Sequence, residues 1–474
     1  MAFEHGIKYS EVATTLVPLR EVDAPTVVVG TCAIHLASDP APVNEPVLCN
    51  SFSEYVKRFG YAGDFGKYTC EEAAYTHFIL YNIKPLIIIN VLDPATHIKT
   101  GTKTVSGVSN TVKVNVAAVL STLTVKSGET NLVKGTDYTA AYDDGKLVLT
   151  IKNKNKLTGD SATLTYSEVD ATKVTTADII GGIDATTGKN KGLDCINDVY
   201  PRCGVLPGCV IAPKYSTDAE VAAVMAAKVT NIVGCFNTIC AVDLDTSTVK
   251  KYSDAYTAKN ANNLVDKNQI VCFPMVALGN EKYHLSTHVA AIMSRTDADN
   301  DDVPYVSPSN KSLQADSMCL ADGTEILIAK DQADWLNSVG IVCGLNMNGY
   351  RLFGNRTAIY PASTDPKDNF IAVRRMMNWI ANSIVVNFWS RIDMPITKRN
   401  AEAVVDSINQ WLSGLIAREF LVAGECYFLA DKNPVTELAA GKLVFSLSVT
   451  PPPPARQIIF EMEYNVDALS AIFS

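Results

Sequence analysis

One internal segment of this 474-residue chain differs in composition from the sequence on either side of it. Residues 98–170 contain 13 Thr and 9 Lys but no Cys, Pro, Arg, Trp, Phe or Met. Short runs rich in β-branched residues, such as 111–116 and 146–151, are separated by turns that contain glycine. The pattern predicts a small all-β module, and its foreign composition indicates an insertion into a host domain.

The sequence on both sides of this segment alternates short apolar strands with helices. Residues 23–97 and 171–345 together predict one discontinuous, layered α/β domain. Its expected helices are Glu71–Asn82, residues 284–295, and one that begins at the Thr217–Glu220 capping box. Its expected strands are residues 26–30, 86–92, 209–212, 238–242 and 270–278.

Residues 346–455 predict an α+β C-terminal domain. Apolar residues recur with the 3.6-residue period of a helix over 368–390 and again over 400–418. A strand is expected over 443–449. The fold class is therefore a multi-domain α/β (α+β) protein with an all-β insertion.

Both ends of the chain read as extended arms, over residues 1–22 and 456–474. In the C-terminal arm Phe460, Met462 and Tyr464 alternate with glutamates, which predicts a half-buried strand. The prolines at 451–454 hold that strand away from the preceding domain. Two interpretations stay open: each arm completes a sheet of its own chain, or it adds to the sheet edge of another subunit.

The overall composition excludes some classes of protein. Apolar residues make up 47% of the chain, too many for a disordered protein, and 50 acidic against 41 basic residues give a net charge of −9, which disfavours nucleic-acid binding. The longest apolar run, Pro85–Leu92, is too short to span a membrane. No secretory signal opens the sequence and the 12 Cys form no CxxC pair, so we expect free thiols in a reducing cytoplasm.

None of the candidate motifs supports catalysis or cofactor binding. Gly181–Lys191 has the wrong glycine spacing for a phosphate loop and lacks the hydroxyl residue after Lys189. His284 and His288 have a zinc-like spacing but no intervening glutamate, and Asp297–Asp302 lacks the glycine of a calcium loop. The sequence predicts no catalytic residue, no cofactor and no metal. A catalytic triad assembled from distant residues remains conceivable, so a cytoplasmic α/β hydrolase with a β accessory module is the alternative, and a surface adhesin is a third hypothesis.

Several segments, taken in order, carry a resemblance to a known family. They are His5–Val12 with Val27–Gly30, Ile179–Gly192 with Pro207–Pro213, Pro304–Lys311, Leu336–Ile341, Tyr350–Thr357, Arg374-Arg375, Ile392–Pro395, Lys432–Pro434, Gly441–Leu443 and Pro452–Pro454. This ordered set resembles the contractile tail sheath proteins of phages and phage-tail-like particles such as R-type bacteriocins. Phe353 stands where many relatives have Trp in the signature Phe353–Thr357.

The resemblance implies a structural, non-enzymatic subunit of a virion or phage-tail-like particle, assembled in the host bacterial cytoplasm. Such subunits stack as hexameric rings around a tail tube and contract to drive the tube through a cell envelope. The implied partners are further copies of the chain, the tube protein, and baseplate and tail terminator proteins, without nucleic acid or membrane insertion. The insertion would face outward and the C-terminal domain would lie near the tube. The arm strands would pair with neighbouring subunits through Ile7, Tyr9, Val12, Ile458, Phe460, Met462 and Tyr464.

Overall fold

The computed structural model describes residues 24–107, 110–143 and 145–472. An eight-stranded sheet with the order β2-β3-β1-β13-β14-β15-β20-β21 forms its centre. The six inner strands are parallel and the two edge strands are antiparallel to their neighbours. The strands are β1 (Thr26–Gly30), β2 (Val47–Cys49), β3 (Leu86–Asn90), β13 (Cys209–Ile211), β14 (Ile239–Asp243), β15 (Gln269–Cys272), β20 (Ile341–Asn346) and β21 (Tyr350–Phe353).

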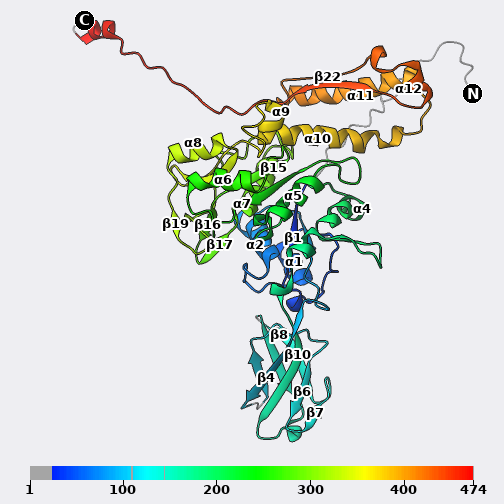
Figure 1. Ribbon diagram of the computed structural model, residues 1–474, viewed down its shortest axis with the longest axis vertical. Helices are drawn as coiled ribbons and strands as arrows, with labels where there is room; N and C mark the ends of the chain where they lie inside the picture. Colours follow the sequence, from blue (N-terminus) through cyan, green and yellow to red (C-terminus); the bar gives the residue numbers. More distant parts are fainter. Residues whose placement is uncertain (1–23, 108–109, 144, 473–474) are drawn as a thin grey trace, which may run out of the picture.

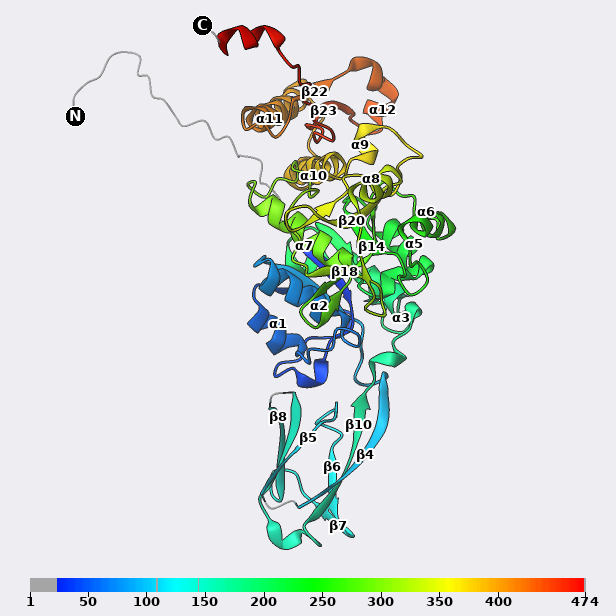
Figure 2. The ribbon, with the colours of Figure 1, turned by 90° about the vertical axis from the view of Figure 1, so that its left-hand side faces the viewer.

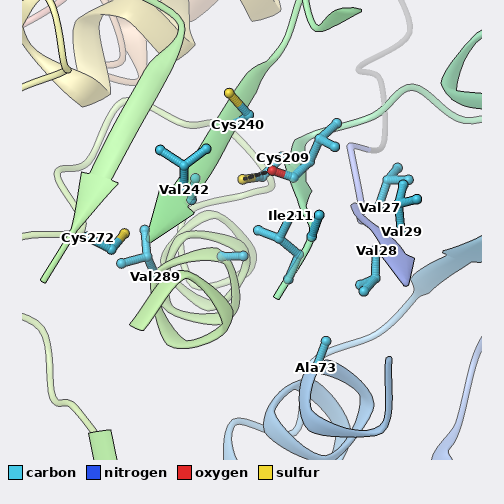
Figure 3. Packing of buried hydrophobic residues seen from close by; sticks show 14 of the residues in the cluster. Val27, Val28, Val29, Ala73, Cys209, Ile211, Cys240, Val242, Cys272 and Val289 are labelled. Carbon is cyan, nitrogen blue, oxygen red and sulfur yellow. Dashed lines mark hydrogen bonds between the residues drawn. The ribbon is translucent and has the colours of Figure 1, made fainter. Parts of the chain in front are cut away.

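Helices cover both faces of this sheet, which explains why its inner strands are apolar throughout rather than alternating. Figure 2 shows α1 and α2 on one side of the sheet and α3, α5 and α6 on the other. Side chains from β1, β13, β14 and β15 meet Ala73 of α2 and Val289 of α7 in the core (Figure 3). The helices are α1 (Phe52–Phe59), α2 (Thr69–Tyr75), α3 (Thr176–Ile180), α4 (Val199–Cys203), α5 (Ala219–Lys228), α6 (Tyr252–Ala261), α7 (Leu285–Ala298) and α8 (Lys330–Ser338).

Two smaller sheets flank the core. One is four-stranded, with the order β17-β16-β18-β19, and the other is the β11–β12 hairpin that follows α3. The strand expected over 270–278 is divided into β15 and β16 because Pro274 has no N–H to contribute to a ladder. These strands are β11 (Gly182–Ile183), β12 (Asn190–Lys191), β16 (Met275–Leu278), β17 (Glu281–Tyr283), β18 (Ser317–Cys319) and β19 (Glu325–Ile326).

The Thr/Lys-rich segment folds into two packed sheets with a hydrophobic core of its own. Leu147, Leu149 and Leu164 are completely buried there. The sheets have the orders β4-β10-β6-β7 and β5-β9-β8, and they lie at one end of the molecule (Figure 1). The strands are β4 (Ile98–Ser106), β5 (Thr111–Val114), β6 (Thr124–Ser127), β7 (Thr130–Leu132), β8 (Tyr138–Asp143), β9 (Lys146–Ile151) and β10 (Ser161–Val169).

A third hydrophobic cluster lies at the opposite end of the molecule, in the last third of the chain. Trp379 of α10 and Leu412 of α11 belong to it, and a two-stranded hairpin packs on α11 (Figure 1). The elements are α9 (Pro366–Asn369), α10 (Ile371–Phe388), α11 (Lys398–Ala417), β22 (Ala423–Phe428), α12 (Val435–Ala439) and β23 (Phe445–Thr450). Together with the layered core and the all-β segment, this arrangement confirms the predicted fold class.

Three local expectations need correction. The boundary expected after residue 345 is wrong, because β21 pairs with β20 and continues the central sheet to Phe353. The cap of α5 is Asp218, whose carboxylate accepts from the amides of Glu220 and Val221, rather than the predicted Thr217. The helix expected over 71–82 begins at Thr69 and changes to a π-helical turn after Tyr75.

Candidate assembly site

The C-terminal arm contacts almost nothing in its own chain. After β23 the chain runs without a strand or helix from Pro451 to Asn465, and it leaves the body of the molecule (Figures 1 and 2). The side chains of Ile458, Phe460, Met462 and Tyr464 are 70%, 85%, 95% and 74% exposed. The predicted strand therefore does not form within the chain, because a strand needs a neighbouring edge for its N–H and C=O groups.

The exposed arm side chains keep the alternation seen in the sequence. In an extended chain, Phe460 and Met462 lie on one face, and Glu461 and Glu463 lie on the other. Large apolar side chains that are this exposed indicate an interaction surface rather than an ordinary protein surface. The three N-terminal arm residues, Ile7, Tyr9 and Val12, lie outside the described residues.

The hairpin β22–β23 is the sheet nearest to the root of this arm. Cys426 is opposite Leu447 in its antiparallel register. No strand in the described ranges pairs with the outer edge of either β22 or β23. An isolated two-stranded sheet is only marginally stable without a partner, so the hairpin depends on what packs against it.

A side chain from α11 covers one of these two edges. The amide of Asn409 accepts from the N–H of Cys426 at 2.7 Å and donates to its C=O at 2.9 Å. These two backbone groups point away from β23, so Asn409 takes the place of a neighbouring strand at the middle of β22. The outer edge of β23, including the backbone of Leu447, is the one left open to a further strand.

A hollow of about 330 Å³ lies beneath β23. α11 packs against β22, and β23 overhangs the end of α10 and the loop that follows it. The lining is mainly apolar, with Arg391 as its one charged side chain among the described residues. It consists of Ile384, Phe388, Arg391, Ile392, Met394, Pro395, Asn400, Ala401, Val404, Ile408, Cys426, Leu443, Phe445 and Leu447.

The apolar surface continues around the mouth of the hollow. Trp389 is 63% exposed and Ile392, which lines the hollow, is 57% exposed, although the adjacent Phe388 packs on the buried cluster of α10 and α11. Core-forming segments do not leave so many large side chains in water unless another surface covers them. The hairpin, the hollow and the loop therefore form one incomplete unit, which we name the β23 acceptor site.

The carboxyl edge of the central sheet is where an α/β hydrolase would hold its nucleophile. Asp243 at the end of β14 accepts from the hydroxyls of Ser216 (3.1 Å) and Ser286 (2.5 Å), and from the amide of Ser286 (2.9 Å). Both serines are at most 1% exposed, so no substrate reaches either hydroxyl. The carboxylate caps the first turn of α7, which is a structural role.

The two histidines with zinc-like spacing bind different partners. His284 donates from Nδ1 to Glu72 at 2.9 Å, and the ring of His288 hydrogen-bonds to the hydroxyl of Tyr81 at 3.0 Å. Burial lowers the pKa of His284, but the adjacent carboxylate of Glu72 outweighs it and raises the pKa to about 9. In the described ranges no group of three His, Cys, Asp or Glu side chains is placed to hold a metal ion.

The other sequence motifs also have local structural roles. The glycine-rich loop Gly181–Lys191 forms the β11–β12 hairpin, in which Lys191 pairs with Asp184 at 2.5 Å. Asp297–Asp302 spans the last residues of α7 and the turn that follows it. Every described cysteine is a free thiol, and no described helix is long and apolar enough to span a bilayer.

Comparisons with known proteins agree with this architecture. Residues 363–465, which include the acceptor site and most of the arm, match the family model of the phage tail sheath C-terminal domain. The tail sheath protein of Burkholderia phage BcepMu is 29% identical, over 98% of this chain and 97% of its own length. Over nearly its whole length the chain is similar to contractile tail sheath proteins, and residues 363–465 match their C-terminal domain.

More distant sheath proteins share parts of the sequence or the whole fold. The major tail sheath protein of Serratia phage KSP20 is 25% identical over 64% of this chain and 75% of its own. The sheath complex of the extracellular contractile injection system PVC, in its contracted state, superposes with a TM-score of 0.59 at 12% identity over 99% of both chains. The contracted helical sheath of the anti-feeding prophage gives 0.59 at 14% identity, over 98% of this chain and 100% of that one.

The similarity to sheath proteins bears on the interpretation of the β23 acceptor site. Two of the matching structures are a sheath complex and a helical sheath. The sequence located the arm through its alternation, but the open edge of β23, the hollow and the cover from Asn409 had no separate signal. The hydrolase alternative is not supported, because the matching relatives are sheath proteins and the serines next to Asp243 are buried.

Proposed function

We propose that this chain is the repeating, non-enzymatic subunit of a contractile sheath, and that copies are linked when the C-terminal arm of one adds to β23 of another. The observation that carries the proposal is the pair of incomplete surfaces in a single chain. One is an extended arm whose apolar face lies in water, and the other is an open strand edge above an apolar hollow.

The two surfaces are complementary in shape and chemistry. A strand that pairs with the outer edge of β23 extends the hairpin over the hollow and the 389–395 loop. Its inward side chains, Phe460 and Met462, then cover apolar surface, while Glu461 and Glu463 stay in water. Burying Phe460 and Met462 is worth about 1.5–3 kcal/mol each, before the cost of ordering the arm.

Donation from one copy to the next gives a polymer rather than a closed dimer. The donor and acceptor surfaces differ, so the contact is heterologous and propagates into rings or a helix. We propose that the polymer is a stack of hexameric rings around a tail tube, with the C-terminal domain near the tube and the insertion outside. The N-terminal arm, including Ile7, Tyr9 and Val12, would make a second link to a neighbouring sheet edge.

The proposed partners follow from this assembly. They are further copies of the chain, the tube protein, and the baseplate and tail terminator proteins that meet the ends of the sheath. A structural neighbour comes from the baseplate of the anti-feeding prophage, which supports the baseplate contact (TM-score 0.58, 13% identity, 98% of this chain and 100% of that one). The sheath would assemble in the host cytoplasm, and contraction would use free energy stored on assembly to drive the tube through an envelope.

Removal of the arm tests the proposal. The truncation that lacks residues 456–474 should stay folded but form neither tubes nor rings in negative-stain micrographs, at concentrations where the full chain polymerises. The matched control is E461A/E463A, which changes only the outward face of the arm and should assemble. Tubes formed by the truncation would contradict arm donation, and a full chain that stays monomeric would contradict the sheath function itself.

A further inference from the structure

The last described segment of the chain is a short helix with one apolar face. Beyond the extended part of the arm, residues Val466–Ile472 form a 3-10 helix, which has three residues per turn. Val466, Leu469 and Ile472 therefore lie on one face, and they are 62%, 43% and 67% exposed. We name this segment the terminal helix. A row of three large, exposed apolar side chains indicates an interaction surface.

Asn465 separates the terminal helix from the strand-forming part of the arm. Its side-chain oxygen accepts from the N–H of Asp467 at 3.0 Å, as a helix-capping side chain does. The period-2 alternation that ends at Tyr464 therefore does not continue into the helix. The arm thus has two parts: a strand-forming part, which pairs with β23 in the proposed assembly, and a helix that this pairing does not use.

A second unpartnered apolar surface lies on the loop between α10 and α11. Trp389 and Ile392 are more than half exposed there, and Met394 and Ile396 are each 41% exposed. We name residues 389–396 the apolar loop. Trp389 and Ile396 are not among the residues that line the hollow. A strand that covers the hollow therefore leaves these two side chains in water.

The apolar loop lies at the Phe445 end of β23. α11 begins at Lys398, directly after the loop, and β22 begins soon after α11 ends. β22 then runs back along α11, since Cys426 in the middle of β22 bonds to Asn409 in the middle of α11. β23 is antiparallel to β22, so it runs from the loop toward Thr450, at the far end of α11.

Within one chain the terminal helix lies far from the apolar loop. The arm leaves β23 after Thr450, which is the end away from the loop, and runs outward over residues 451–465. Figure 1 shows the C-terminus at the far end of this arm, on the opposite side of the molecule from α12. The two apolar surfaces are therefore separate in one copy, and a second copy can bring them together.

We propose that the terminal helix of one copy covers the apolar loop of another, with the donated arm antiparallel to β23. This contact rests on the proposed arm donation. An antiparallel arm ends beside Phe445, so the helix that follows it lies at the loop. A parallel arm would end beside Thr450 and place the helix at the opposite end of α11. Antiparallel pairing is also slightly more stable per residue.

Charge favours the same direction. Asp467 is the one charged side chain among residues 466–474. Arg391 is the one charged side chain that lines the hollow, and in the described ranges no carboxylate forms an ion pair with it. An antiparallel arm brings Asp467 toward Arg391, whereas a parallel arm would bring Arg456 there. Opposite charges at the edge of an apolar contact select its direction more than they add affinity.

Truncation in two steps tests this contact separately from arm donation. The variant that lacks residues 466–474 keeps the strand-forming part of the arm, and its critical concentration, measured by sedimentation, should rise about tenfold. L469K/I472K should have a similar effect. The matched control is A468K/A471K, which adds the same charge on another face of the helix and should assemble as wild type. The melting temperature of the monomer should not change, because these side chains are exposed.

A photoreactive side chain at position 469 locates the helix in polymers that mix ¹⁴N- and ¹⁵N-labelled chains. We expect crosslinks to residues 389–396 that join the two labels. Crosslinks to any other segment would overturn the proposal, and those to residues 418–423 would show that the arm is parallel.

The two truncations separate the failure of this contact from the failure of arm donation. If removal of residues 466–474 leaves the critical concentration unchanged but removal of 456–474 prevents assembly, the helix contact is wrong and arm donation stands. If both truncations assemble as wild type, both proposals are wrong. L469K/I472K that assembles as well as A468K/A471K would also overturn the helix contact.

Discussion

The insertion and the C-terminal domain lie at opposite ends of the molecule. Their edge strands differ in whether they oppose or allow pairing with a strand of another chain. The insertion buries Leu147, Leu149 and Leu164 completely within its own two sheets. Its long edge strand, β4, carries Lys99 and Lys103, and charged side chains on an edge oppose pairing with other chains. The C-terminal domain instead leaves an apolar hollow beneath the edge of β23.

This contrast indicates which part of the chain needs a neighbouring copy. A region that is complete in one copy gains little from association, whereas a region with an open edge and an exposed apolar arm gains much. On this account assembly depends on the C-terminal end of the molecule, and the insertion decorates the polymer without holding it together.

A charge on the inward face of the arm should abolish assembly. Met462→Lys is expected to raise the critical concentration at least about a hundredfold, because burying an ammonium group under β23, where the lining holds Arg391 and no carboxylate, costs several kcal/mol. The melting temperature of the monomer should not change, since Met462 is 95% exposed. Sedimentation and thermal melting check the two parts, with E461Q on the outward face as the control. Normal assembly of Met462→Lys would contradict donation of the arm to β23.

Filling the hollow should increase the stability of the monomer and weaken assembly. Val404→Phe adds apolar volume where the monomer has a cavity, so we expect the monomer to gain about 1 kcal/mol. The same ring occupies the space meant for Phe460 or Met462, so the critical concentration should rise about tenfold. Chemical denaturation and sedimentation measure the two quantities. A variant that improves both would show that the hollow is not the arm's binding site.

Alkaline pH should weaken the core rather than the insertion. The pKa of His284 is raised to about 9 in the folded protein, whereas in the unfolded chain it is near 6.5. The pairing with Glu72 therefore stabilises the fold to its full extent at pH values below about 6.5. That stabilisation, on the order of 3 kcal/mol, is lost as pH rises through about 9. Unfolding curves between pH 6 and 10 measure it, and H284N, which keeps a donor but does not titrate, should flatten the dependence. An equally steep loss in H284N would contradict this assignment.

The insertion should respond to acid instead. Lys156, at 2.8 Å, holds the pKa of Asp137 below its usual value. Because the pKa of Asp137 is lower in the folded protein than in the unfolded chain, where it is near 3.8, its ionised form stabilises the fold at pH values above about 3.8. This stabilisation is lost as the pH falls through the pKa of Asp137 in the folded protein. Near-UV circular dichroism below pH 4 should show that acid destabilises the wild type more than D137N, because D137N has no carboxylate at position 137 to protonate. Equal acid sensitivity of the two would contradict the prediction.

Removal of the insertion should have the smallest effect. The N–H of Asp170 donates to the C=O of His97 at 2.9 Å, so the two ends of the insertion lie side by side. Replacing residues 99–168 by a short Gly-Ser linker should leave the critical concentration within about twofold of wild type. Sedimentation measures it. Loss of polymers from a folded deletion variant would show that the insertion is part of the linkage.

The sequence could predict what depends on local pattern. The run Thr26–Gly30 is apolar on both faces, which already indicates a strand inside a parallel sheet, and the composition of residues 98–170 marks the insertion. The period-2 alternation of Phe460 and Met462 indicates a strand, but a strand is a relation between two segments. Nothing local to the arm says that its partner lies outside its own chain.

The acceptor site could not be predicted because it depends on contacts between distant residues. The sequences of β22 and β23 do not indicate which of the two strands has an open edge. The edge of β22 is covered by Asn409, which lies 17 positions before Cys426 in the sequence. The hollow is lined by residues of α10, α11 and the hairpin that lie far apart in the sequence, and no periodicity encodes such a relation. The expected C-terminal boundary failed for the same reason, since β21 is recognisable as part of the core only through its pairing with β20.

A photo-crosslink from the arm shows which surface the arm contacts in the polymer and whether that surface belongs to another copy. A photoreactive side chain at position 462 is activated in polymers assembled from a mixture of ¹⁴N- and ¹⁵N-labelled chains, and the products are mapped by mass spectrometry. The account predicts crosslinks to β23 and to the 391–395 loop, in peptide pairs that mix the two labels. Crosslinks confined to one label, or mapped to the insertion, would contradict donation of the arm to β23 of another copy.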